Sequence, residues 1–260
     1  MNSLNNNIDN TDNFIGIKID SKCIISTFCK ESGVIEFIDS LLLKVRPHNI
    51  THGESFIALL INGLSFNKRA LYNISDEMSK MPLYEIFGRD ISHSYFNDDA
   101  LARSLEAISD FGPDAFFLSF SSYLTPIVLS KIPNLDKIIN KITDKTVYHA
   151  DTTNFCVKGE FKNAKNGSVQ IVPGHSKTGQ NNLNLFSLSL VKYIFGLPIY
   201  MHSFSGNGSD NKELAASIQN TMKALRANLK NPENFQKPFF IADAVFLVKI
   251  ILLISLPTPN

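Results

Sequence analysis

The sequence predicts an α/β protein, in which a mainly helical N-terminal domain precedes a domain with the element order β-β-β-α-β. Apolar residues recur at helical spacing through the first half of the chain. From Lys145 onward, short stretches rich in β-branched and aromatic residues replace this pattern. Two of these stretches, Val147–Phe155 and Phe239–Phe246, each carry one aspartate, Asp151 and Asp243. The chain therefore centres on two predicted acidic strands.

The predicted N-terminal domain spans residues 14–144 and follows a leader at residues 1–13 that we expect to be disordered, because Asn and Asp dominate it. A short strand is expected at Phe14–Ile19. The helices that follow are predicted from apolar residues on one side and from boundary signals such as Asn97-Asp98-Asp99 and Gly112-Pro113. The predicted helical segments are Val34–Val45, Glu54–Phe66, Leu71–Met78, a helix after Asn97 with Leu101, Leu105 and Ile108 buried, Ala115–Leu129 and Leu135–Ile142.

The predicted C-terminal domain spans residues 145–260. After the first acidic strand, a polar turn leads to a strand at Ser168–Val172, and Gly196 marks a hairpin between Leu183–Phe195 and Leu197–Phe204. We expect three antiparallel strands from this segment. Asp210 starts the next helix, which extends to Leu229, and Glu213 completes a capping box. The buried side of that helix is predicted to carry Leu214, Ile218, Met222, Leu225 and Leu229.

The composition is that of a globular chain with no overall attraction to nucleic acid. The 260 residues are 44% hydrophobic, which is enough for a substantial core. Lysine and arginine number 25 against 24 aspartates and glutamates, so the net charge is +1. A DNA-binding surface would therefore have to be local.

The sequence contains no signal peptide or membrane span that we can identify. Val245–Leu256 is apolar, but Lys249 interrupts it and it is shorter than the roughly 20 residues that a membrane helix needs. The three cysteines lack a close pairing motif, which is typical of reduced thiols. We therefore expect a cytoplasmic protein with no membrane partner.

Four residues form a pattern similar to a zinc site: Cys23, Cys29, His48 and His52. The spacing of the two histidines is acceptable, but the two cysteines are further apart than the two to four intervening residues of usual zinc sites. We therefore expect core thiols and surface imidazoles here.

A carboxylate pair on neighbouring strands could hold divalent metal ions. Mg²⁺ prefers oxygen ligands and takes one or two carboxylates from a protein. Two metal ions about 3.5–4 Å apart can activate an attacking oxygen and stabilise a leaving one in phosphoryl transfer. Either aspartate alone could instead cap a helix or form a turn. The metal-site hypothesis therefore requires Asp151 and Asp243 to lie side by side.

The order of these motifs resembles the RNase H-like core of the DDE transposases of bacterial insertion sequences, with Asp151-Thr152-Thr153 on the first strand and Ala242-Asp243 on the fourth. The resemblance covers about residues 16–246 and includes the helical N-terminal domain of one branch of this group. Between the two acids it rests on Gly174-His175-Ser176-Lys177, Gly196-Leu197-Pro198 and Gly206-Asn207-Gly208-Ser209-Asp210. In the helical half it rests on His52-Gly53-Glu54, Asn62-Gly63-Leu64, Arg69-Ala70-Leu71-Tyr72 and Asn97-Asp98-Asp99-Ala100-Leu101-Ala102-Arg103.

The resemblance implies DNA transposition, in which the ends of a transposon are hydrolysed and the freed 3′ hydroxyl attacks target DNA. It implies that Asp151 and Asp243 are catalytic ligands of two Mg²⁺ ions and that DNA is the partner, and it allows a homo-oligomer. His175 and Lys177 become candidates for contacts with the DNA backbone, with a solvated loop as the alternative.

The sequence departs from the family pattern in two places. Gln180 and Asn182 stand where the family usually has an arginine and an aspartate, and the third acid of the family, a glutamate on a later helix, does not occur before Asn260. We therefore expect an incomplete RNase H-like domain, truncated by a frameshift or premature stop and inactive on its own. A non-catalytic module that binds DNA ends or a transposase as an inhibitor is the alternative, and a poorly folding remnant is a third reading.

Overall fold

The structure is a computed structural model of the chain, and its described part divides into two compact units. One unit extends to Ala107 and the other begins at Ile108. The second unit begins before the predicted domain boundary near residue 145. It includes the long helix α7 (Pro113–Ser130), because this helix packs on strand β4 (Pro198–Ser205). The described residues are 22–43, 49–65, 67–135, 146–159, 161, 169–174, 183–193, 195–227 and 237–242.

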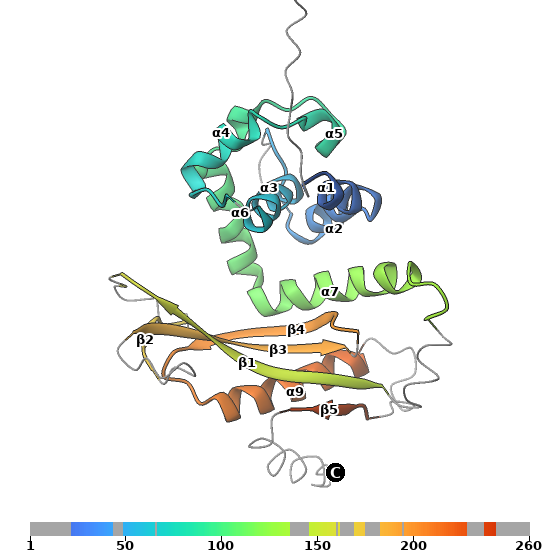
Figure 1. The fold of residues 1–260 in the computed structure, drawn as a ribbon, viewed down its shortest axis with the longest axis vertical. Coiled ribbons are helices and arrows are strands. Elements are labelled where there is room, and N and C mark those ends of the chain that lie inside the picture. Colours follow the sequence, from blue (N-terminus) through green and yellow to red (C-terminus); the bar gives the residue numbers. More distant parts are fainter. Residues whose placement is uncertain are drawn as a thin grey trace, which may run out of the picture. The chain divides into compact units, whose positions relative to one another are not determined.

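The first unit is helical, as the sequence predicts (Figure 1). Its core consists of apolar side chains that repeat at helical spacing, including Val34, Ile38, Ile57 and Ile61 at no more than 1% exposure. The elements are α1 (Lys22–Glu31), α2 (Val34–Leu41), α3 (His52–Leu64), the 3₁₀ turn η1 (Leu71–Asn73), α4 (Ile74–Met78), α5 (Leu83–Phe87), the 3₁₀ turn η2 (His93–Tyr95) and α6 (Asp98–Phe111).

Two details of this unit differ from the prediction. Helix α1 is absent from the predicted set; it packs against α3 and α5, and the buried Lys22 ammonium donates to Glu77 Oε1 at 2.9 Å. On α6, Leu101 is fully buried but Leu105 is 45% exposed, because the buried side continues through Ser104 instead. The predicted burial of Leu105 is therefore wrong. The predicted segments Phe14–Ile19 and Leu135–Ile142 lie wholly or largely outside the described residues.

The start of α3 is fixed by a capping box and by an ion pair. Thr51 Oγ1 accepts from the Glu54 N–H at 3.1 Å, and the Thr51 N–H donates to Glu54 Oε2 at 2.7 Å. The Arg89 guanidinium donates to both carboxylate oxygens of Glu54, at 2.7 and 2.9 Å, and to the Asn49 carbonyl. A glycine precedes Glu54 because a Cβ at Gly53 would lie 2.4 Å from the carbonyl oxygen of Ile35 on α2.

The second unit is a mixed sheet with helices, and after α7 its elements follow the predicted order β-β-β-α-β, apart from a two-residue strand after the first strand. Strand β1 (Val147–Val157) pairs antiparallel with β3 (Asn184–Tyr193), and β3 pairs antiparallel with β4. After helix α9 (Asp210–Ala227), strand β5 (Phe239–Ile241) returns parallel to β1. The strand predicted at Ser168–Val172 is found as the two-residue β2 (Val172–Pro173), which pairs with β3.

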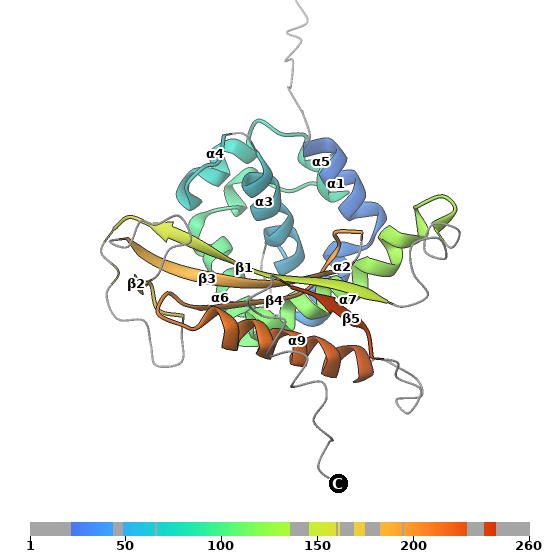
Figure 2. The ribbon, with the colours of Figure 1, turned by 60° about the horizontal axis from the view of Figure 1, so that its bottom comes forward.

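Helix α9 covers one face of this sheet, so that face carries the core (Figure 2). Side chains alternate along each strand, and every second one points toward α9. Of the predicted buried side of α9, Leu214 and Ile218 are buried and Met222 and Leu225 pack against them, while Leu229 lies outside the described residues. The central cluster contains Tyr148, Ala150, Val191, Tyr200, Leu214 and Ile218. In the part of the chain that the structure describes, no helix is long and apolar enough to cross a membrane.

Candidate functional site

Asp151 lies in the middle of β1, on the face of the sheet opposite α9. Its neighbours Ala150 and Thr152 are buried at 3% and 1% exposure, whereas Asp151 is exposed. The Thr152 backbone N–H donates to Asp151 Oδ1 at 2.7 Å. The alternation along β1 thus presents this carboxylate to solvent, where it can meet a ligand.

The pairing register of β1 with β5 can be compared with the predicted pairing of Asp151 with Asp243. Val147 pairs with Phe239 and His149 with Ile241, so each residue of β5 lies 92 positions after its partner on β1. Asp151 and Asp243 are separated by the same number of positions. Asp243 itself lies outside the described residues, as do His175 and Lys177.

Two further polar side chains share the face of Asp151. His149 precedes it by two residues on β1, and Lys192 on β3 is the cross-strand partner of His149. Lys192 is therefore a diagonal neighbour of Asp151, a relation in which Cα atoms are typically about 7–8 Å apart. Period-two alternation in the sequence could have indicated His149. Lys192 could not be found that way, because its position depends on the pairing register of two strands.

The described residues supply one of the two predicted metal ligands, Asp151. Within them, no three His, Cys, Asp or Glu side chains gather into a group that could hold a metal ion. In the zinc-like pattern, Cys29 is a core thiol, as predicted, and burial raises its pKa to about 11. The expected surface position of His52 is wrong: the residue is 8% exposed, and Nδ1 is 2.9 Å from Ser104 Oγ on α6. His48 lies outside the described residues.

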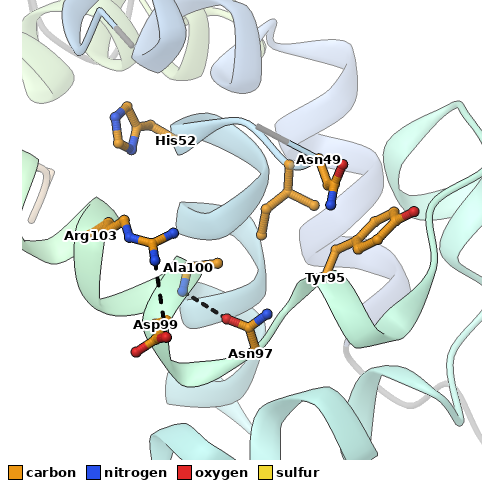
Figure 3. A pocket seen from close by; sticks show the side chains of 8 residues that line it. Asn49, His52, Tyr95, Asn97, Asp99, Ala100 and Arg103 are labelled. Carbon is orange, nitrogen blue, oxygen red and sulfur yellow. Dashed lines mark hydrogen bonds and ion pairs between the residues drawn. The ribbon is translucent and has the colours of Figure 1, made fainter. Parts of the chain in front are cut away.

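The N-terminal unit contains a polar pocket of about 170 Å³ between the first turns of α3 and α6 (Figure 3). It brings together two of the motifs that carry the resemblance, one beginning at His52 and one ending at Arg103. Arg103 Nη2 lies 4.0 Å from Asp99 Oδ2, one turn earlier on α6. The lining residues are Asn49, Ile50, His52, Tyr95, Asn97, Asp99, Ala100 and Arg103.

The other motifs of the helical half form structural contacts. The Asn62 side chain donates to the Arg69 carbonyl at 3.0 Å and accepts from the Arg69 N–H at 2.8 Å. Asn62 therefore holds the chain that follows α3, as Glu54 holds the chain before it. These motif residues specify the shape of the unit.

A histidine in the second unit joins three elements. His202 on β4 is hydrogen-bonded through Nδ1 to Asp114 Oδ2 on α7, and its Nε2 lies 3.5 Å from Glu213 Oε2 on α9. The hydrogen bond to Asp114 raises the pKa of His202, and the charge of Glu213 acts in the same direction, against partial burial of the ring. Asp114 and His202 are 88 positions apart, and no local pattern in the sequence relates them.

Comparison with known proteins identifies a similarity in the helical part of the chain. No curated protein and no solved structure matches the sequence. Residues 16–122 match a family described as a domain of unknown function, DUF4277. The matched segment contains the polar pocket and all four motifs of the helical half, and the description of the family assigns no activity to it.

Proposed function

We propose that the second unit binds divalent metal ions for phosphodiester chemistry on DNA, as in the DDE transposases that the sequence resembles. The observation that carries this proposal is the parallel register of β1 and β5. Continued by two residues beyond the pair His149–Ile241, the same register would place Asp243 beside Asp151. In parallel strands, paired residues project from the same face of the sheet, so the two carboxylates would converge there.

The connection between the acidic strands supports the same proposal. Strands β4, β3, β1 and β5 lie side by side in this order, and the chain returns through α9 to place β5 beside β1. This topology makes the first strand and the strand after the helix neighbours, which is the relation that the resemblance requires for DNA transposition.

The donor chemistry fits Mg²⁺. Asp151 offers a solvent-accessible carboxylate, a hard oxygen ligand of the type that Mg²⁺ prefers. Bound metal would supply charge neutralisation at a phosphate undergoing transfer. In this proposal Asp151 and Asp243 hold the metal, and Lys192 contributes a cation beside them for a DNA phosphate. His175 and Lys177 remain predicted DNA contacts.

Metal binding and DNA cleavage by the full chain test the proposal. Mn²⁺ binding can be followed by electron paramagnetic resonance, and cleavage by Mg²⁺-dependent nicking of DNA that carries the transposon ends. Asp151→Asn and Asp243→Asn are each expected to weaken Mn²⁺ binding at least tenfold, since each removes one charged ligand. Asp110→Asn, at an exposed position of α6, is the matched control and should change neither property. Mn²⁺ affinity that is the same in all four proteins would refute the metal site.

A second candidate function is that of a non-catalytic module that binds DNA ends or a transposase and acts as an inhibitor. The separate compact N-terminal unit with its polar pocket favours it. Binding of transposon-end DNA without nicking, at an affinity unchanged by Asp151→Asn, is the result expected for such a module.

A further inference from the structure

The pocket of the N-terminal unit has the size of a site for a small polar group. Its volume of about 170 Å³ is well below the roughly 300–1,000 Å³ of pockets for small organic ligands. It is several times the roughly 30 Å³ that one water molecule occupies in the liquid. A single oxyanion such as a phosphate group fits this space, whereas a whole nucleotide does not.

The lining of the pocket is rich in hydrogen-bond donors. Arg103 presents its guanidinium, which matches a phosphate with two parallel hydrogen bonds. Asn49 adds a side-chain amide, whereas the ring of Tyr95 lines the pocket and its hydroxyl points away from Arg103 in Figure 3. The apolar share of the wall comes from Ile50 and Ala100.

Two helices begin at this pocket, and their first turns carry the acidic residues Glu54 on α3 and Asp98 and Asp99 on α6. His52 is the first residue of α3, and Asp99 and Ala100 belong to the first turn of α6. Backbone N–H groups and the helix dipole make such ends favourable for anions. Here the N–H groups of Glu54 and Ala100 already donate to Thr51 and Asn97, so the ligand class follows from the side-chain donors of the pocket.

The partner of Arg103 in the pocket can be displaced. Asp99 is 83% exposed and its carboxylate lies 4.0 Å from the guanidinium, at the outer limit of an ion pair. An exposed pair of this kind contributes little to stability. A phosphate would therefore compete with Asp99 for Arg103, and the two residues should affect phosphate binding in opposite directions.

We propose that this pocket, lined by Arg103 and Asn49 between the first turns of α3 and α6, binds a phosphate group, either free or within the backbone of a nucleic acid. The inference does not depend on the metal site of the second unit.

The test is a titration of the full chain with inorganic phosphate at constant ionic strength, followed by calorimetry, together with a titration of a labelled DNA duplex followed by fluorescence anisotropy. Arg103→Gln should weaken binding about tenfold or more, since hydrogen bonds to charged groups are worth about 1.5–3 kcal/mol. Asp99→Asn should strengthen it, because the competing carboxylate is lost. The matched controls are Lys80→Gln and Asp76→Asn, from another exposed pair of the same unit, and both should leave binding unchanged.

Each outcome of this experiment decides something. Opposite effects of Arg103→Gln and Asp99→Asn on both ligands support a site for nucleic-acid phosphates, and the same effects on inorganic phosphate alone support a site for a free ion. Affinities for both ligands that Arg103→Gln leaves unchanged would overturn the proposal. Equal losses in Arg103→Gln and Lys80→Gln would also overturn it, since they would indicate a general charge effect. Circular dichroism of each variant separates loss of the site from loss of the fold.

Discussion

At the scale of single residues, His202 makes the second unit sensitive to pH. Asp114 raises the pKa of His202 above its ordinary value of 6.5, so the protonated ring is favoured in the folded state. A group with a raised folded-state pKa contributes stability that is complete below the unfolded pKa and disappears as the pH rises through the folded pKa. The contribution should be about 1 kcal/mol, because the side chain is 31% exposed and water screens the pair.

We therefore expect the melting temperature of the second unit to fall as the pH is raised above 6.5 through the folded-state pKa of His202. His202→Asn should remove most of this dependence, and Asp114→Asn should do the same because it removes the main cause of the shift. Calorimetric melting at a series of pH values measures the effect. His93→Asn, at an exposed histidine of the first unit, is the control, and an equal flattening in that variant would contradict the assignment.

Two glycines of the same helix allow a paired test of packing. Both lie on α3, but a Cβ at Gly53 would lie 2.4 Å from the Ile35 carbonyl oxygen, whereas a Cβ at Gly63 would meet nothing within 4 Å. Gly53→Ala should destabilise the first unit by about 1–3 kcal/mol, as overpacked cores do. Gly63→Ala should be neutral or stabilise it by about 0.5–1 kcal/mol through helix propensity. Urea unfolding followed by circular dichroism measures both, and equal effects would refute the close contact of α2 with α3.

At the scale of elements, helix positions could be predicted wherever an apolar stripe coincided with boundary signals. The Asn97-Asp98-Asp99 run and Gly112-Pro113 bracket α6 because capping chemistry is local. Helix α1 could not be predicted in this way. It depends on packing against α3 and α5 and on the contact between Lys22 and Glu77, which are 55 positions apart.

The connection between α3 and the chain after α5 gives a prediction at this scale. The Glu54 side chain is 4% exposed, and Arg89 supplies its countercharge. Arg89→Ala should destabilise the first unit by about 2 kcal/mol, because it leaves a buried carboxylate without that partner. Chemical unfolding measures the loss. Arg69→Ala is the control, since the Arg69 guanidinium lies 3.8 Å from Glu77 and is 48% exposed, and its loss should stay below about 0.5 kcal/mol.

At the scale of the whole molecule, the α/β class and the order of the long elements could be predicted because hydrophobic periodicity changes near residue 145. The surroundings of the candidate sites could not. Lys192 lies near Asp151 only through the register of β1 and β3, and the polar pocket forms only when α3 and α6 meet. Such neighbours are set by tertiary packing, which leaves no periodic signal in the sequence.

Metal binding should also be visible in the stability of the whole chain. A ligand that binds only the folded state raises stability, by about 2.7 kcal/mol when its concentration is one hundred times its Kd. If the second unit binds Mn²⁺ through Asp151, added Mn²⁺ should raise the melting temperature, and Asp151→Asn should abolish this rise. Differential scanning calorimetry with and without Mn²⁺ measures it. A rise of equal size in Asp151→Asn would locate the metal elsewhere.

The proposed metal binding requires one particular alignment of β5 with β1, and the parallel contact between these two strands is short. Side chains alternate between the faces of a sheet, so a register that continued from β5 to Asp243 with a shift of one residue would direct this carboxylate toward α9 and away from Asp151. The rings of Tyr148 and Phe240, paired in this contact and stacked with centroids 5.5 Å apart on the α9 side, oppose such a shift. The contact between Tyr148 and Phe240 on the α9 side would therefore determine whether two carboxylates can lie together on the other face of the sheet. We expect replacement of Phe240 with a small residue to weaken the proposed metal binding, although neither carboxylate is changed.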